Sequence, residues 1–107
     1  MPRFKPVIIT ATAPNREEAE HIGCLLLESG LAACVQYENI FSQYVWNGGL
    51  CGEEEVRIVI KTARCHYKAV EKTIVRNHSY DCPQVLMQPV QGGFLPYLKW
   101  MKAQLGL

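Results

Sequence analysis

The chain has 107 residues, of which 49% are hydrophobic and 20% are charged, and its formal net charge is +1 at pH 7. This length suits one compact domain, expected to run from residue 1 to residue 107, and is short for two. The balanced charge contains no run of one sign, which argues against a non-specific nucleic-acid binder. The apolar stretches are far below the roughly 20 residues of a membrane span, and no signal-peptide core is visible, so we expect a soluble, cytoplasmic protein without a membrane partner.

Five cysteines cannot all pair within one chain, and without an export signal we expect free thiols in a reducing compartment. Two interpretations are open for them: soft-metal ligands, or small hydrophobic side chains that fill a core. The second is favoured because free cysteine is among the most buried residue types. Cys34, which lies within an Ala-Ala-Cys-Val stretch, is expected in the core.

The first half of the chain predicts a strand, a helix and a long hairpin. Residues 7–11 form a β-branched run, and Asn15 is a suitable N-cap for an amphipathic helix over 16–29 that ends at Gly30. Residues 31–40 and 41–46 have strand-like composition, and Asn47-Gly48-Gly49 is a strong turn signal. The alternation of residues 53–62 predicts the returning strand, with Val56, Ile58 and Ile60 on its buried face.

The second half of the chain predicts a helix, a strand and a terminal helix. Tyr67, Val70 and Ile74 are spaced for a second amphipathic helix, which should end before a loop at 78–83. Residues 84–90 are expected to form the last strand. After Gly92-Gly93, helical spacing of apolar residues resumes, and it involves Phe94, Leu98, Met101 and Leu105.

The order of these elements is β-α-β-β-α-β followed by a helix. It is typical of the ferredoxin-like α+β sandwich, here with an antiparallel sheet, a long β-hairpin and an extra C-terminal helix. Since both main helices should cover one face of the sheet, the other face is left open. Its apolar groups, such as Val59 and Tyr44, predict burial against further copies of the chain.

Several short motifs follow one another from residue 12 to residue 100. They are Thr12-Ala13-Pro14, Leu31-Ala32-Ala33-Cys34-Val35, Tyr44-Val45-Trp46-Asn47-Gly48, Glu55 through Lys61-Thr62, His78-Ser79-Tyr80-Asp81 with Pro83, and Tyr97-Leu98-Lys99-Trp100. In this combination and order the chain resembles the CutA family of divalent-cation tolerance proteins. The resemblance implies a ferredoxin-like protomer in a homotrimer, tolerance to divalent metals, copper above all, and neither a known reaction nor an organic cofactor.

The resemblance places metal ligation on a cysteine beside the first strand and on a pair of adjacent histidines. Those positions match Ala11 and Asn77-His78 here, so His78 alone keeps its donor. Useful affinity needs about three or four donors, and Cys82, four residues later, offers a thiolate that suits copper or zinc. We therefore predict His78 and Cys82 as ligands of copper or another divalent cation. The alternatives are that His78 caps the loop or lies in an interface, and that Cys82 fills a small apolar site.

A second candidate site does not depend on metals. Tyr44 and Trp46 share one strand face, and Glu55 and Lys61 share a face of the next strand. With Tyr80 and Asp81 from the loop, they could line a pocket between subunits for a small molecule. Alternatively, Tyr44 and Trp46 anchor the subunit contact, and Glu55 and Lys61 form ion pairs there.

Enzyme signatures of hydrolases, P-loop and dinucleotide-binding proteins and zinc proteases do not occur in the sequence, so we expect no enzyme. The alternative function is a trimeric signalling module like the PII proteins, which would bind a small metabolite between subunits. Such a module needs a long mobile loop, and the tight turn at 47–49 offers none. A third possibility is a scaffold for other proteins.

Overall fold

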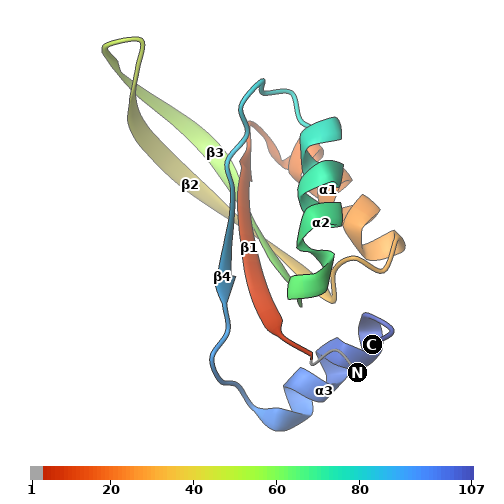
Figure 1. Cartoon of the computed structure of the whole chain (residues 1–107). Coiled ribbons are helices and arrows are strands. Elements are labelled where there is room, and N and C mark those ends of the chain that lie inside the picture. The colour runs from red at the N-terminus through yellow and green to blue at the C-terminus, as the bar shows by residue number, and fades with distance from the viewer. Residues whose placement is uncertain (1–3) are drawn as a thin grey trace.

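The computed structural model describes residues 4–107 and confirms the ferredoxin-like order of elements (Figure 1). A strand, a helix and a hairpin come first, and a helix, a strand and a last helix follow. The bounds are β1 Pro6–Ala13, α1 Arg16–Glu28, β2 Cys34–Trp46, β3 Gly49–Ala63, the 3-10 turn η1 Arg64–His66, α2 Tyr67–Arg76, β4 Val85–Pro89 and α3 Leu95–Gln104.

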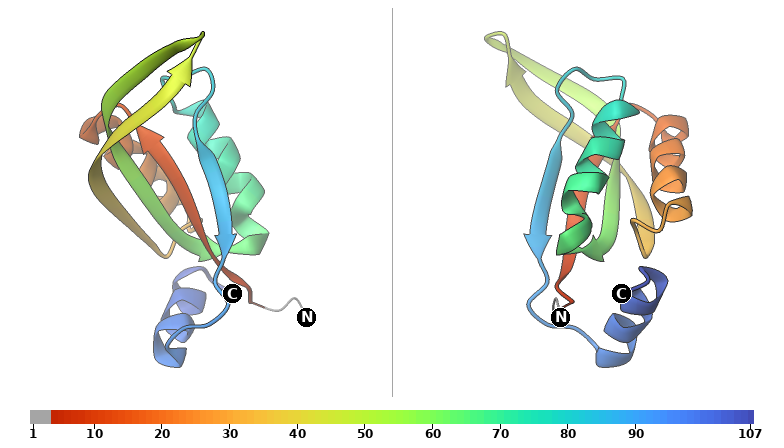
Figure 2. Two further views of the ribbon diagram at one scale, coloured as in Figure 1. Left: turned by 90° about the vertical axis from the view of Figure 1, so that its left-hand side faces the viewer. Right: turned by 45° about the vertical axis from the view of Figure 1, so that its right-hand side comes forward.

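The four strands form one antiparallel sheet in the order β2-β3-β1-β4. Helices α1 and α2 lie side by side against one face of this sheet, as the two views of Figure 2 show. Apolar residues of the strands and helices meet between the two layers and exclude water there. The largest fully buried side chains include Ile9, Ile22, Leu26, Ile58, Ile60 and Ile74.

The register of the sheet decides which side chains face the helices. Ile9 pairs with Ile60 on the helix-covered face, so the next pair, Thr10 and Val59, lies on the open face. The prediction that Cys34 lies in the core is wrong. Cys34 pairs with Lys61 on the open face, and its neighbour Val35 packs against the core in its place.

The hairpin is more regular than the sequence predicts, and its returning strand is longer. Strand β2 is continuous where two strand segments were expected, although it begins at Cys34 instead of residue 31, and β3 begins at Gly49 instead of residue 53. Asn47 and Gly48 have φ angles of 50° and 78°, which is the paired left-handed conformation of a tight hairpin turn. Strand β1 pairs with β3 only as far as Val56. The part of the hairpin beyond that point, residues 40–55, is therefore a two-stranded ribbon that projects from the sheet (Figure 1), and it is called the outer hairpin below.

Local signals in the sequence fix the ends of α1. The backbone N–H of Glu18 donates to the Asn15 side chain at 2.8 Å, which confirms the predicted N-cap. Gly30 has a φ of 73°, as expected for the residue that ends the helix.

The C-terminal helix α3 packs at the end of the sheet away from the hairpin tip (Figure 1), where Met101 and Leu105 contact Ala33 and Ala63. In residues 4–107 no helix is long and apolar enough to cross a bilayer.

Candidate functional site

A pocket of about 730 Å³ opens on the sheet face that the helices leave uncovered. It lies between the outer hairpin and the loop that joins α2 to β4. Carboxylates, thiols and aromatic rings share its wall. These side chains are Tyr44, Trp46, Cys51, Glu53, Glu55, Tyr80, Asp81 and Cys82.

The hairpin register explains why the strand residues of the pocket face the same way. Tyr44 pairs with Cys51, and Ser42 pairs with Glu53. Directly paired residues of an antiparallel ladder project from the same face, and so does every second residue along each strand. The hairpin therefore supplies the aromatic and acidic side chains of one wall, and the loop supplies the other.

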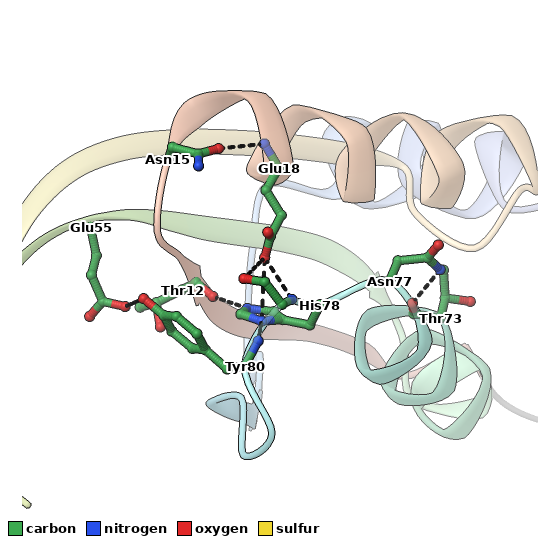
Figure 3. Close-up of polar contacts among 9 residues, drawn as sticks. Thr12, Asn15, Glu18, Glu55, Thr73, Asn77, His78 and Tyr80 are labelled. Carbon is green, nitrogen blue, oxygen red and sulfur yellow. Dashed lines mark hydrogen bonds and ion pairs between the residues drawn. The ribbon is translucent and has the colours of Figure 1, made fainter.

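Glu55 and Tyr80 connect the two walls. Tyr80 Oη donates to Glu55 Oε2 at 3.0 Å, and Glu55 is only 9% exposed (Figure 3). Burial raises the pKa of Tyr80 well above its ordinary value of 10.0, and the hydrogen bond to the Glu55 carboxylate raises it further. Hydrogen bonding to Glu53 raises the pKa of Tyr44. Both phenols are therefore neutral hydrogen-bond donors at physiological pH.

His78 holds the loop that carries Tyr80. Its side chain is fully buried, its Nε2 lies 2.6 Å from the carbonyl oxygen of Thr12, and its Nδ1 accepts the backbone N–H of Tyr80 at 3.0 Å (Figure 3). A neutral ring protonated at Nε2 satisfies both bonds. Glu18 Oε2 lies 3.4 Å from Nδ1 and accepts the backbone N–H and the hydroxyl of Ser79. Because both ring nitrogens are engaged, the geometry supports the loop-capping interpretation of His78 and gives no support to a metal ligand.

The structure brings most of the predicted pocket residues together. Tyr44, Trp46, Glu55, Tyr80 and Asp81 all line the pocket, and so does the predicted metal ligand Cys82.

Lys61 does not belong to this group. It shares the open face with Glu55, but six residues along a strand separate the two by about 20 Å. Its Nζ lies 3.5 Å from the hydroxyl of Tyr97, against α3.

Besides His78, the family resemblance assigned metal ligands to the positions of Ala11 and Asn77, and neither residue lines the pocket. Ala11 is fully buried in the core under the helices. The side-chain amide of Asn77 donates to the carbonyl oxygen of Thr73 at 2.8 Å and thereby closes the end of α2 (Figure 3). Within residues 4–107, no three side chains from His, Cys, Asp and Glu lie close enough to hold a metal ion together.

Sequence reasoning missed Cys51 and Glu53 as pocket residues and Glu18 as the anchor of the loop. The first two could have been found by counting outward from the Asn47-Gly48 turn, because the turn type fixes which residues pair across the hairpin. Glu18 carries no such signal. An acidic residue in the first turn of a helix is already explained by the helix dipole, so nothing marks Glu18 as a loop contact. Its partner Ser79 is also 61 residues away in the sequence.

Comparisons with known proteins agree with this fold. The chain is 38% identical over 105 residues to the divalent-cation tolerance protein CutA of Pectobacterium atrosepticum, covering 97% of this chain and 96% of that protein. CutA of Escherichia coli is 34% identical over 100 residues, covering 92% of this chain and 89% of that protein.

Solved structures superpose closely on the chain. The structure described as the periplasmic divalent cation tolerance protein CutA from Archaeoglobus fulgidus has a TM-score of 0.92 at 33% identity, covering 94% of this chain and 98% of that chain. CutA1 from Oryza sativa has a TM-score of 0.91 at 32% identity, covering 94% of each chain. The family described as CutA1 divalent ion tolerance protein matches residues 7–104. The chain therefore belongs to the CutA1 family of divalent ion tolerance proteins.

Proposed function

We propose that this chain forms a homotrimer that binds a divalent cation, with copper as the first candidate, and that it catalyses no reaction. The observation that carries the proposal is the pocket on the open sheet face, where carboxylates and thiols gather in a protein whose net charge is only +1. Thiolates suit copper and zinc, and carboxylates accept most divalent ions. Membership of a divalent ion tolerance family supports the same class of ligand.

Cys82 is the proposed metal donor of the chain. It is exposed, it lies in the pocket wall, and Asp81 beside it offers a carboxylate. One protomer does not assemble three donors at one point within residues 4–107. We therefore propose that a second copy of the chain completes the coordination sphere, since a firmly held divalent ion needs about three or four ligands.

The projecting hairpin supports the homotrimer. A two-stranded ribbon is marginally stable in water on its own, and this one exposes large apolar side chains at its tip. Val45 and Leu50, which pair across the hairpin on the face away from the pocket, are 68% and 74% exposed in the protomer. Covering them with another copy removes apolar surface from water and gives the outer hairpin the partner it lacks.

The cation proposal is tested with reduced, metal-free protein titrated with Cu(II), and with Cu(I) under exclusion of oxygen, in competition with a chelator. We expect Cys82→Ala to weaken binding about tenfold or more, as loss of one soft donor should. Cys65→Ala is the matched control, because Cys65 is exposed at η1 and lies outside the pocket. Wild-type binding no tighter than about millimolar, or equal effects of the two variants, would contradict the proposal.

The trimer proposal is tested by light scattering after size exclusion. We expect a mass of three copies of the 12.1 kDa protomer. Leu50→Glu at the hairpin tip should shift the protein toward monomer, whereas Lys68→Glu on the exposed face of α2 should not. A monomeric wild-type protein at micromolar concentration would overturn the proposal.

The cellular compartment is proposed to be reducing, as in the cytoplasm. All five cysteines are free in the structure, and two of them, Cys51 and Cys82, share the pocket wall. Trapping the thiols with an alkylating reagent at the moment of cell lysis tests this, because five modified thiols per chain are expected.

The PII-like alternative is not favoured, because Asn47 and Gly48 alone join the hairpin strands.

A further inference from the structure

We infer that the pocket between the outer hairpin and the loop before β4 binds an organic cation that carries amino or guanidinium groups. This role goes beyond the proposed binding of a metal ion. It uses the same cavity, but it does not depend on copper.

The charge of the pocket wall is the first argument. Glu53, Glu55 and Asp81 are lining residues, and no Lys, Arg or His lines the cavity in the described part of the chain. The next cation along that face of β3, Arg57, is already paired, with its Nη2 3.0 Å from Glu38 Oε1. The cavity therefore concentrates unbalanced negative charge, and a wall of this kind attracts cations.

The size of the cavity and the placement of its carboxylates are the second argument. The cavity of about 730 Å³ is within the range of small-molecule sites. Glu53 and Glu55 lie two residues apart on β3, and Asp81 comes from the loop on the other wall. Carboxylates on two walls of a roomy cavity suit a ligand that carries more than one positive charge.

The aromatic side chains are the third argument. Tyr44, Trp46 and Tyr80 line the same cavity as the carboxylates. The face of an aromatic ring attracts ammonium and guanidinium groups, most strongly for Trp, and it also packs against the alkyl chain that carries them. A hydrated divalent ion has no alkyl chain to pack against these rings.

Glu55 supplies the buried anchor. Only 9% of the residue is exposed, and in the described residues its carboxylate receives one hydrogen bond, from Tyr80. Among the described residues, neither Glu55 oxygen is both buried and unpartnered, so the oxygen that Tyr80 does not contact is open to solvent. An ammonium group in the cavity can donate to that oxygen.

The test is calorimetric titration of the assembled, reduced protein in EDTA, so that metal binding does not contribute. The probe is cadaverine, a linear diamine with two ammonium groups. Its controls are the pentanediol of the same chain length, which is uncharged, and sodium chloride at matched ionic strength. We expect cadaverine to bind and both controls to give no saturable heat. Failure of the copper titration with a positive cadaverine titration would reject only the metal proposal.

Adjacent acidic residues provide matched variants. Glu55→Gln and Glu53→Gln should each weaken cadaverine binding roughly tenfold or more, because a charge-assisted hydrogen bond is lost. Glu54→Gln should change it less than about twofold, since Glu54 lies on the other face of the hairpin and outside the cavity. If Glu55→Gln fails to fold, Glu53→Gln against Glu54→Gln decides. Equal effects of the two, or an assembled protein that binds no cadaverine because another copy fills the cavity, would overturn the inference.

Discussion

His78 and Thr12 lie 66 residues apart in sequence, and a 2.6 Å contact joins the Nε2 of the first to the carbonyl oxygen of the second. The contact fastens the loop before β4 to the end of β1. Because Nδ1 of the same ring accepts the N–H of Tyr80, the position of Tyr80 over Glu55 depends on this imidazole. One buried histidine thus shapes a pocket whose cavity it does not line.

We predict that His78→Ala destabilises the protein by about 2 to 4 kcal/mol. The variant leaves a cavity in place of a buried ring and removes the partners of a carbonyl and an N–H that are partly buried. Urea unfolding followed by circular dichroism measures the change. His21→Ala is the matched control, because His21 is exposed on α1. A His78→Ala protein as stable as His21→Ala would contradict the assigned role.

Glu18→Gln should cost about 1 kcal/mol of unfolding free energy. Glu18 Oε2 accepts two hydrogen bonds from Ser79, at 3.1 and 3.0 Å, and the substitution removes the charge that strengthens them. Glu17→Gln is the control, because it removes the same charge from the same first turn of α1 and thus corrects for the helix dipole. The difference between the two variants in chemical unfolding reports the loop contacts alone. No difference would mean that the dipole accounts for the whole effect of Glu18.

Short-range chemistry made most of the fold predictable. Asn15 was identifiable as a cap and Asn47-Gly48 as a hairpin turn because each conformation depends on the residue itself. The alternation of Val56, Ile58 and Ile60 correctly gave the buried face of β3. In these cases the structure depends on residues that are close to one another in the sequence.

The incorrect or incomplete predictions involve long-range contacts. Cys34 was assigned to the wrong face because the phase of β2 after Gly30 depends on its pairing with β3. His78 carries a ring whose two partners, Thr12 and Tyr80, become visible only when the loop meets β1. Lys61 shares a strand face with Glu55, but two residues on one face can still lie far apart along the strand, and Lys61 lies outside the pocket. A sequence pattern assigns residues to faces more readily than it places them beside one another.

Gly23→Ala is predicted to destabilise the protein, although alanine is favoured over glycine by about 1 kcal/mol in a helix interior. A Cβ at Gly23 would overlap the side chain of Tyr37, which packs across α1 from β2. Thermal unfolding should therefore show a lower Tm for Gly23→Ala. In a Tyr37→Leu background, the same substitution should lower the Tm less, since the overlapping ring is gone and the Val35 side chain alone remains close. An increase in Tm for Gly23→Ala alone would show that Tyr37 moves aside freely.

The stability of the protein in alkaline solution should report the Tyr80–Glu55 hydrogen bond. The folded state raises the pKa of Tyr80, first through burial and then through Glu55, so it holds the phenol proton more firmly than the unfolded chain does. A group of this kind contributes stability that is complete below its unfolded pKa of about 10 and is lost as the pH rises above that value. The free energy of unfolding should therefore fall more steeply with pH in wild type than in Tyr80→Phe.

Two variants isolate this effect. Tyr80→Phe should cost about 1 kcal/mol at neutral pH, where the hydrogen bond is intact, and the gap to wild type should shrink between about pH 10 and pH 11.5. Glu55→Gln keeps the phenol but removes the carboxylate, so its pH dependence should lie between the other two. Urea midpoints measured across this range give all three curves. Parallel curves for wild type and Tyr80→Phe would mean that the phenol is not held in the folded state as the structure places it.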